Sequence, residues 1–346
     1  MLTELRGRIA LAAVKRSLPA RMAADSVAAL PEGLHAAIAG SGSPLPDPRR
    51  GNPCVAVIAG QRVFIVDAGE RASETLNRMQ IAPQHIEAVL LTHFHSDHIG
   101  GLASLAIQRW AAARATAPMR VLGPPGVERV VAGYNEAYAM DSGYRTAHHG
   151  EAVLPSAGAG MTAEPFAVPE GDDSIVVLHD DDLTITAFTV DHPPAEPAVG
   201  FRFDYKGRSL VVSGDTSRSE VLVRVAQGAD LLIHDALSRE LVKLVEDAAR
   251  NAGLAERAKI FSDLPDYHAS PQEAADAARE AGVDALVLTH IVPPLPMKAL
   301  EGPFLGDAAQ RFTGPLWIAR DGDLYSLALG TGGVARTGLF RRGPAG

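Results

Sequence analysis

The chain has 346 residues, of which 41 are acidic and 32 are basic, and its formal net charge is −9. A hydrophobic content of 47% excludes wholesale disorder, and no apolar run approaches the roughly 20 residues of a membrane-spanning helix. The acidic balance disfavours a dedicated nucleic-acid binder, and a single cysteine, Cys54, excludes a disulfide framework. Because twelve histidines stand against that one cysteine, a metal in this protein would be held by nitrogen and oxygen.

Residues 1–30 predict an alanine-rich helix with a local net charge of +3. Its apolar stretch, residues 9–14, is too short for a secretory signal, so we expect a cytoplasmic protein without a signal peptide or a membrane span. We expect this helix to pack on its own domain. Contact with a membrane surface is the alternative for a basic helix of this kind.

From residue 31 to residue 346, short β-type runs alternate with helical stretches, which is typical of an α/β domain. Strands are predicted at residues 35–40, 55–59, 62–66, 86–92, 174–178, 183–190, 198–205 and 209–213. Helices are predicted at residues 70–80, from residue 101 onward, and at residues 217–227, 237–255 and 271–281. Ser270 and Pro271 are the expected N-cap and first-turn proline of the last helix.

Residues 141–173 break this alternation, since they are rich in glycine, alanine and proline, and we expect an insertion or lid there. The segments AVLLTH at residues 88–93 and ALVLTH at residues 285–290 are nearly identical, which indicates two similar halves. We therefore expect a single domain over residues 31–346, although the length alone also allows two domains.

The strongest chemical signal is the run Thr-His-Phe-His-Ser-Asp-His at residues 92–98, directly after an apolar strand. It places three imidazoles and one carboxylate, His93, His95, His98 and Asp97, at a strand-to-helix junction. Neutral imidazoles and carboxylates are zinc ligands, and the end of a strand gives the ligand loop a rigid base. The run therefore predicts a metal site.

Other strands also end in groups that bind metals, namely His192, Asp215, the pair His234-Asp235, and His290. Because sites in α/β sheets form at the carboxyl ends of strands, we expect several of these ends to converge. Six or seven ligands exceed the needs of one tetrahedral zinc ion, and a carboxylate can bridge two ions. A dinuclear site is the economical interpretation.

These residues resemble the metallo-β-lactamase superfamily, through the His-x-His-x-Asp-His run, His192, Asp215, His290 and the upstream Phe-Ile-Val-Asp-Ala-Gly at residues 64–69. Within that superfamily they resemble the ribonuclease Z-like branch, including its zinc-dependent arylsulfatases. The segments that indicate this branch are residues 40–44, 192–202, 213–216 and 268–270. The resemblance implies an αββα sandwich, in which two mixed sheets are flanked by helices, over residues 31–330.

The resemblance also implies a ligand set for two zinc ions, with manganese or iron as alternatives. His93, His95 and His192 would hold one ion, Asp97, His98 and His290 would hold the other, and Asp215 would bridge them. A hydroxide between the ions would be the nucleophile. Asp97 would also orient that hydroxide or shuttle its proton.

The resemblance also implies that His268 protonates the leaving oxygen, a role that suits an imidazole because it can donate a proton at neutral pH. The alternative is a structural histidine ahead of the helix that begins at Ser270. Asp235 would orient His268 or serve the structure only, and Asp67 is expected to hold a ligand loop by a hydrogen bond. Arg49 and Arg50 would either meet an anionic substrate group or remain solvated loop charges.

The remaining histidines carry weaker expectations. His148 and His149 are expected at the surface of the insertion, with a lid over the site as the alternative. The environments of His35, His85 and His179 indicate no metal ligand, and Cys54 is expected to be a small core residue.

The predicted activity is hydrolysis of a small anionic or ester substrate, an aryl or alkyl sulfate or a phosphodiester, with a lactone or carboxylic ester as the alternative. Transfer RNA processing is disfavoured because residues 120–200 contain three arginines, no lysine and an acidic cluster at residues 180–182. No nucleic-acid partner is therefore expected. An iron-dependent oxidoreductase is a lesser alternative, and the resemblance suggests a homodimer.

Overall fold

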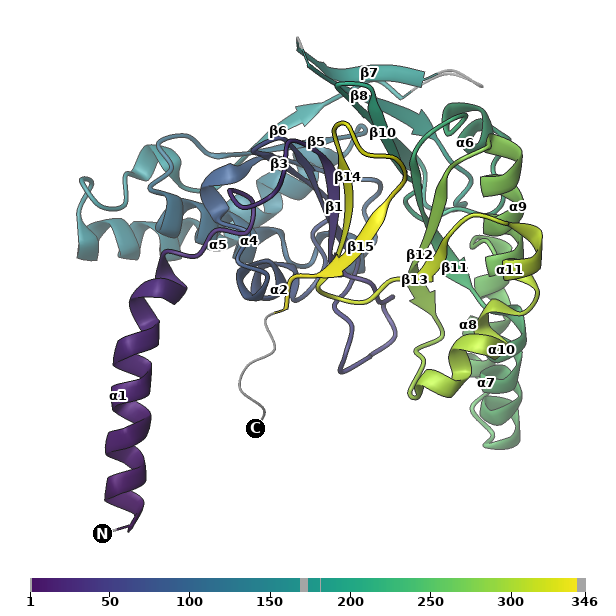
Figure 1. The fold of residues 1–346 in the computed structure, drawn as a ribbon, viewed down its shortest axis with the longest axis horizontal. Coiled ribbons are helices and arrows are strands. Elements are labelled where there is room, and N and C mark those ends of the chain that lie inside the picture. Colours follow the sequence, from purple (N-terminus) through teal and green to yellow (C-terminus); the bar gives the residue numbers. More distant parts are fainter. Residues whose placement is uncertain (1, 169–173, 181, 341–346) are drawn as a thin grey trace.

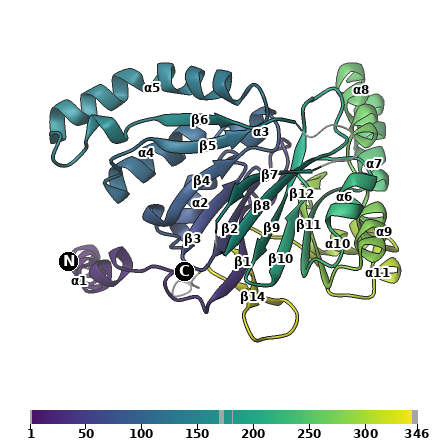
Figure 2. The same ribbon diagram turned by 90° about the horizontal axis from the view of Figure 1, so that it is seen from above.

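The computed structural model describes residues 2–168, 174–180 and 182–340, and it consists of two β-sheets packed face to face between two groups of helices (Figure 1). Figure 2 shows helices α2 to α5 against one sheet and helices α6 to α11 against the other. This is the αββα sandwich that the sequence predicts, with two mixed sheets flanked by helices.

The eight-stranded sheet has the order β15-β14-β1-β2-β3-β4-β5-β6. Its strands are β1 (Gly33–Gly40), β2 (Cys54–Ala59), β3 (Arg62–Val66), β4 (Ile86–Leu90), β5 (Met119–Gly123), β6 (Met161–Pro165), β14 (Asp323–Ala328) and β15 (Ala335–Gly338). The helices α2 (Ala72–Arg78), α3 (Ser96–Ile99), α4 (Leu102–Ala113) and α5 (Val127–His149) follow its strands.

The seven-stranded sheet has the order β13-β12-β11-β10-β9-β8-β7. Its strands are β7 (Ser174–His179), β8 (Leu183–Thr189), β9 (Val199–Tyr205), β10 (Arg208–Val212), β11 (Leu231–Leu237), β12 (Ala285–Val292) and β13 (Leu316–Ile318). Its helices are α6 (Glu220–Val225), α7 (Arg239–Asn251), α8 (Ala255–Asp263), α9 (Pro271–Ala281), α10 (Glu301–Leu305) and α11 (Ala308–Arg311).

Three hydrophobic layers hold the sandwich together. Between the sheets, Phe64, Phe201 and Phe203 are fully buried with aliphatic residues of both sheets. A second layer joins the first sheet to its helices, and a third joins the second sheet to the alanine-rich face of α9. Burial of this apolar surface, worth about 25 cal/mol per Å², is the main stabilising contribution to the fold.

The predicted hairpin at residues 55–66 is confirmed, because β2 and β3 pair antiparallel around Gly60. The helix predicted at residues 237–255 is α7, which ends at Asn251, shortly before Gly253, whose φ is +72°; the next helix, α8, begins at Ala255 and was not predicted. A left-handed backbone of this kind favours glycine and ends the helix. The strands β5, β6, β13, β14 and β15 and the helix α5 were not predicted.

Residues 141–173, expected to be an insertion, contribute to the sheet rather than standing apart from it. Residues 141–149 are the end of helix α5, and β6 is the edge strand next to β5. Residues 169–173 of this expectation lie outside the described part of the chain. The domain boundary at residue 30 stays a prediction, with helix α1 (Leu2–Met22) before it.

Among the described residues, no helix combines the length and the apolarity that crossing a membrane requires. Helix α1 extends away from both sheets (Figure 1).

Candidate metal centre

The predicted metal ligands meet where strands of both sheets end. His93, His95, Asp97 and His98 lie on the loop and short helix α3 that follow β4, His192 follows β8, Asp215 follows β10, and His290 lies in β12. In space they form two adjoining groups, and within each group the ligating atoms lie within 4.8 Å of one another. One group is His93, His95, His192 and Asp215, and the other is Asp97, His98 and His290.

Three ring nitrogens face one another in the first group. His93 Nε2 lies 2.9 Å from His95 Nδ1, and His192 Nε2 lies 3.2 Å from the same atom. His93 and His192 are buried, whereas His95 is exposed at the rim of the site. Three converging imidazole nitrogens are a coordination pattern that zinc and related divalent ions use.

Asp215 joins the two groups through one oxygen. Its Oδ2 lies 3.1 Å from His290 Nε2, 3.2 Å from His98 Nε2, 3.9 Å from His192 Nε2 and 4.0 Å from His93 Nε2. His290 Nε2 also lies 3.3 Å from Asp97 Oδ2. The carboxylate of Asp215 therefore occupies the position that a ligand shared by two ions requires.

Outward-facing nitrogens of the same rings are anchored by hydrogen bonds, with Asp67 as the main acceptor. His98 Nδ1 donates to Asp67 Oδ2 at 2.8 Å. His93 Nδ1 contacts the Thr92 hydroxyl at 3.0 Å, and that hydroxyl donates to Asp67 Oδ2 at 2.8 Å. His192 Nδ1 donates to the backbone oxygen of Tyr267 at 2.9 Å. Such contacts fix the ring orientation and leave the inward nitrogen as a free lone pair, as in metal-binding histidines.

Glycine allows the two ligand loops to interlock. A Cβ atom on Gly69 would lie 2.2 Å from the backbone oxygen of Asp97, and one on Gly101 would lie 2.1 Å from the backbone oxygen of Gly69. The loops are joined by hydrogen bonds from Ala68 N to His98 O at 2.8 Å and from Gly101 N to Ala68 O at 2.7 Å. This close backbone approach holds Asp67 against the histidine run.

The burial of acidic groups shows that the centre suits cations. Asp67, Asp97 and Asp215 are 4%, 7% and 3% exposed, and buried carboxylates are stable only when positive charge or hydrogen-bond donors compensate them. Burial opposes a charge on His98, but Asp215 and Asp67 outweigh it and raise the pKa of this imidazole. The two carboxylates thus favour positive charge at this point of the centre.

The first group behaves differently. Burial lowers the pKa of His93, and burial also lowers the pKa of His95 and of His192. Neutral imidazoles with free lone pairs are the form that binds metal. The residues present therefore fit a pair of metal ions, with three nitrogens on one side, a mixed carboxylate and imidazole set on the other, and Asp215 between them.

His268 lies at the same centre and pairs with Asp235. Its Nδ1 donates to Asp235 Oδ2 at 2.9 Å, and both residues are buried. Burial alone would raise the pKa of Asp235, but the adjacent His234 imidazole and the hydrogen bond from His268 outweigh it and hold the pKa below its usual value. Because the carboxylate accepts the hydrogen bond from Nδ1–H, Nε2 is the nitrogen left to exchange a proton with another group.

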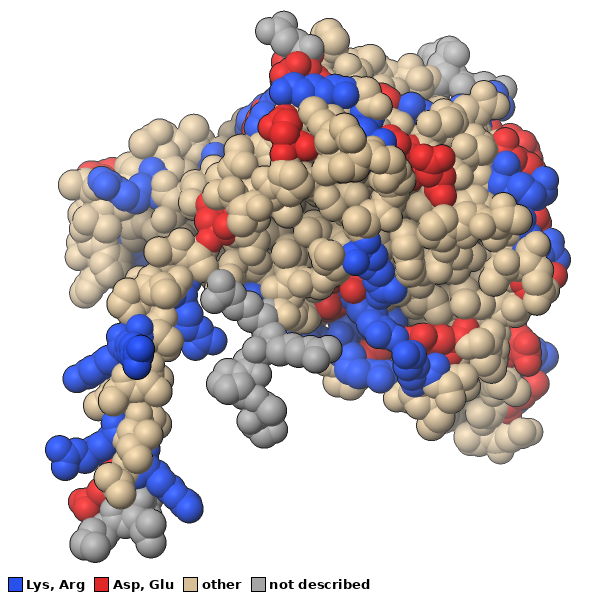
Figure 3. All heavy atoms as spheres, in the orientation of Figure 1, with Lys and Arg blue, Asp and Glu red and all other residues tan. Residues whose placement is uncertain are grey.

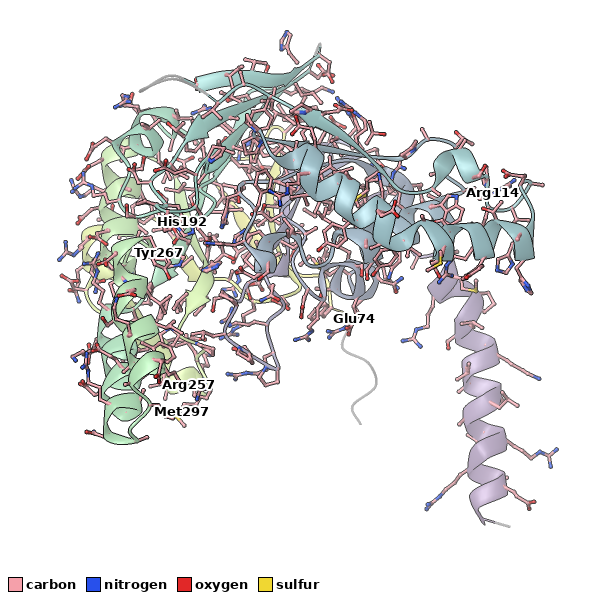
Figure 4. The ribbon with its side chains drawn as sticks, turned by 180° about the vertical axis from the view of Figure 1, so that it is seen from behind. Glu74, Arg114, His192, Arg257, Tyr267 and Met297 are labelled. Carbon is pink, nitrogen blue, oxygen red and sulfur yellow. The ribbon has the colours of Figure 1, made fainter. Side chains whose placement is uncertain are left out.

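A helix cap fixes the position of His268. Ser270 is the N-cap of α9, its hydroxyl accepts from Glu273 N at 3.2 Å, and the Glu273 side chain accepts from Ser270 N at 2.8 Å. This capping box anchors the chain two residues after His268. The Tyr267 ring lies 4.9 Å from the His268 ring and 5.2 Å from the His192 ring, measured between centroids, and Figure 4 shows Tyr267 beside His192.

Other candidate residues from the sequence lie elsewhere. The Arg50 guanidinium is buried and donates to Ser41 Oγ at 2.7 Å and to the backbone oxygen of Ala319, so it holds a loop. The exposed Arg49 side chain donates to the backbone oxygen of Leu295. His148 and His149 are exposed at the end of α5 and do not join the centre.

The other polar groups have structural partners. His35 is buried in β1, His85 pairs with Asp25 at 2.7 Å, and His179 contacts Thr184 at 2.9 Å. Cys54 is buried and, as predicted, belongs to the core, where burial raises the pKa of its thiol.

Sequence reasoning missed Asp321, which holds the loop that follows β1. Its carboxylate accepts from Ser41 N at 3.0 Å, from Ser41 Oγ at 2.8 Å and from Gly51 N at 2.7 Å. The loop lies against the site because Ile291, next to His290, donates its N–H to Ser41 O at 3.1 Å. No local motif marks Asp321, since its role depends on residues about 270 positions away in the chain.

Comparison with known proteins places this geometry in a family context. The family described as "Beta-lactamase superfamily domain" matches residues 62–291. Ribonuclease Z of Mycolicibacterium gilvum (strain PYR-GCK) is 36% identical over 290 residues, which cover 83% of this chain and 94% of the relative. Ribonuclease Z of Mycobacterium avium (strain 104) is 34% identical over 290 residues, which cover 83% of this chain and 96% of the relative.

Solved structures share the fold. The metallo-β-lactamase fold protein YhfI from Bacillus subtilis has a TM-score of 0.61 at 19% identity, covering 85% of this chain and 99% of that one. Human tRNase Z, short form, has a TM-score of 0.59 at 22% identity, and the match covers 84% of this chain and 98% of that one. At these identities the likeness establishes the architecture alone.

Proposed function

Since the chain belongs to the metallo-β-lactamase superfamily, in its ribonuclease Z-like branch, we propose that it is a metal-dependent endonuclease that processes the 3′ end of precursor tRNA. The observation that carries this proposal is the similarity, over most of both chains, to relatives named Ribonuclease Z. The complete set of ligating residues and the His268–Asp235 pair support hydrolysis of a phosphodiester.

This proposal corrects two predictions from the sequence. Hydrolysis of a small sulfate or ester, with an arylsulfatase-like specificity, is contradicted by the names of these relatives, and so is the expectation of no nucleic-acid partner. The argument from charge that led to these two predictions was also physically incomplete. The charge of one segment and of the whole chain was used to judge RNA binding, whereas contact with phosphates depends on where the basic side chains stand on the surface.

The metal-ligand roles stay as the sequence predicts them. His93, His95 and His192 would hold one ion, Asp97, His98 and His290 the other, and Asp215 both. Zinc suits this set of nitrogen and carboxylate donors, and manganese or ferrous iron are the alternatives. When bound, two such ions would activate a water molecule and offset the negative charge that builds up on the phosphate.

The protein's own residues then have two tasks. Asp67 holds His93, through Thr92, and His98 in fixed orientations, so the ligand set is organised before a substrate binds. His268 donates a proton to the ribose oxygen that leaves when the phosphodiester is cleaved, while Asp235 keeps its Nδ1 occupied. A ring nitrogen of His268 lies within 4.8 Å of the ligating atoms of Asp215 and His290, which is within reach of a phosphate there.

The test is cleavage of a transcribed precursor tRNA that carries a 3′ trailer, by zinc-loaded protein, with the product ends mapped by sequencing. We expect one cut on the 3′ side of the acceptor stem, and no cut by the His93→Ala variant. A precursor that remains intact under conditions where the same preparation hydrolyses bis(p-nitrophenyl) phosphate would overturn the proposal.

A further inference from the structure

Helix α1 stands apart from the rest of the structure. It extends from the body as a rod (Figure 1), and every side chain from Glu4 to Met22 is exposed. Its 21 residues give a length of about 31 Å. An isolated exposed helix gains no stability from packing, so its side chains are available for contact with another molecule.

The charge of α1 is opposite to that of the remaining chain. The helix carries five basic residues and one acidic residue, a net charge of +4, against −13 for all other residues in a chain of −9. The basic residues are Arg6, Arg8, Lys15, Arg16 and Arg21. Figure 3 shows these Lys and Arg side chains projecting along the helix on several sides. From Arg6 to Arg21 they span about 22 Å along the axis.

The distribution of apolar residues favours a polyanion over a membrane. Leu11, Val14 and Leu18 are spaced three and four residues apart and share one side of the helix. Leu5 and Ile9 lie on the opposite side, because Ile9 and Leu11 are two residues apart on a helix of 3.6 residues per turn. A helix that lies in a membrane interface needs one continuous apolar face, and α1 has none over its full length.

The direction of α1 brings it to the side of the molecule where the metal centre opens. Strands β1, β3 and β4 run in the same direction, since β2 is antiparallel to both β1 and β3, and β3 is parallel to β4. The site lies at the carboxyl ends of these strands. In Figure 1 the helix extends from the body in the direction taken by the loop that follows β1. A long substrate seated at the site can therefore extend toward α1.

The base of the helix adds a cleft of about 990 Å³ between α1 and the body. Arg21 of α1 and Arg78 of α2 both line it, together with Leu18, Ile81 and Phe340. The Arg78 guanidinium lies over the Phe340 ring, 4.2 Å from its centroid. The one acidic residue in the lining, Asp25, contacts His85 at 2.7 Å. Positive charge thus continues from the helix onto the body.

We propose that α1 is an RNA-binding helix, whose basic side chains contact the phosphate backbone of the tRNA body while the 3′ end lies at the metal centre. This inference rests on the proposed function, because it requires an RNA substrate longer than the segment held at the site. Lysine and arginine contacts to phosphates release counterions, so the resulting affinity is strongly salt-dependent and independent of sequence.

The test compares three zinc-loaded proteins: the wild type, a variant without the basic charges of α1, and a matched variant. The α1 variant is R6Q/R8Q/K15Q/R16Q/R21Q. The matched variant removes five exposed arginines from the opposite edge of the fold, on or beside α6, α8, α9 and α11, and is R218Q/R224Q/R257Q/R279Q/R311Q. Both variants have the same net charge, so a difference between them reports position rather than total charge.

The readouts are the dissociation constant of mature tRNA at several salt concentrations and kcat/KM for bis(p-nitrophenyl) phosphate. We expect the α1 variant to bind tRNA at least ~10-fold more weakly at about 0.1 M salt, with a salt slope lower by about one for each phosphate that it no longer neutralises. The matched variant should bind like the wild type. Hydrolysis of the small phosphodiester, which cannot reach α1, should be unchanged in all three proteins.

Equal tRNA affinity and equal salt slopes in the α1 variant and the wild type would overturn the inference. So would a charge-dependent binding of the wild type to vesicles of phosphatidylglycerol combined with unchanged tRNA affinity. Because mature tRNA has no trailer to cut, this binding test gives its answer even if the chain fails to cleave a precursor, and that failure would count against the proposed function alone.

Discussion

The carboxylate of Asp67 accepts a hydrogen bond from His98 Nδ1 at 2.8 Å, and the same oxygen accepts one from the Thr92 hydroxyl, which contacts His93. One buried carboxylate, itself outside both groups of ligating atoms, thus orients a histidine in each of them. This arrangement explains why the strand β3 is followed by the sequence Asp-Ala-Gly: the acid anchors the rings, and Gly69 lets the loop lie against Asp97.

Replacing Asp67 should therefore weaken metal binding without removing a ligand. We expect Asp67→Ala to lose metal affinity by about 10- to 100-fold, the usual effect of removing a group that orients metal-binding histidines. Competition with a zinc chelator measures this affinity. Asp67→Asn, which keeps an acceptor oxygen, should lose less, and equal losses in both variants would argue against the orienting role.

Removing a ligand should have a larger effect. His93→Ala and Asp215→Ala should abolish activity, and Asp215→Ala should lose more metal because its Oδ2 faces four imidazoles. Metal content by mass spectrometry checks this, with about two ions per chain expected for the wild type. His148→Ala, on the exposed end of α5, is the control and should keep both metal and activity. Full turnover in His93→Ala would contradict the site assignment.

His268 is predicted to matter most when the leaving group is poor. His268→Ala should retain its metal and lower kcat for RNA by about 10²- to 10⁴-fold, the usual contribution of a general acid. The loss should be much smaller for bis(p-nitrophenyl) phosphate, whose leaving phenolate needs no proton. Asp235→Asn should reproduce part of the loss. An equal loss with both substrates would instead indicate a structural role for this histidine.

The buried His35 should make stability depend on pH. Its Nε2 donates to Pro31 O at 3.0 Å and its Nδ1 accepts from Ser326 Oγ at 2.9 Å. One donor and one acceptor nitrogen are the pattern of a neutral imidazole. Burial lowers the pKa of His35 below 6.5. Between that lowered pKa and 6.5 the unfolded chain binds more protons, so this contribution is complete above pH 6.5 and is lost as the pH falls.

Urea denaturation of the wild type and of His35→Gln at pH 8, 7, 6 and 5 measures this effect. The advantage of the wild type in free energy of unfolding should shrink as the pH falls, because only the wild type must bury this imidazole. Metal-binding histidines contribute equally to both proteins and cancel in the difference. A difference that stays constant from pH 8 to pH 5 would show that His35 does not titrate in this range.

The sequence was sufficient to predict which side chains come together at the candidate centre, because they follow strands with strong apolar patterns. The apolar run before His93 and the Ser270-Pro271 helix start are local signals, and local structure follows them. Asp321 and the carbonyl of Tyr267 could not be predicted in this way. Their roles arise from contacts between distant segments, which no short-range pattern encodes.

The dependence on contacts between distant segments also explains why the strands β14 and β15 were not predicted. It explains as well why the substrate was predicted wrongly. Strand β14 pairs with β1 across almost the whole chain, and β15 pairs with β14, so their place depends on tertiary packing. RNA binding was judged from the charge of residues 120–200 as if that segment alone contacted the RNA. In the folded protein the basic residues of α1 project away from the rest of the chain, and neither the net charge nor the charge of residues 120–200 shows this arrangement.

The central claim is that this metal centre acts on precursor tRNA, and the most direct test is a comparison of kcat/KM for two substrates on one zinc-loaded preparation. The substrates are a precursor tRNA with a 3′ trailer and p-nitrophenyl sulfate. We predict that kcat/KM for the precursor lies in the usual enzymatic range, about 10⁴ M⁻¹s⁻¹ or higher, and that it far exceeds the value for the sulfate. Efficient hydrolysis of the sulfate with no cleavage of the precursor would contradict the account.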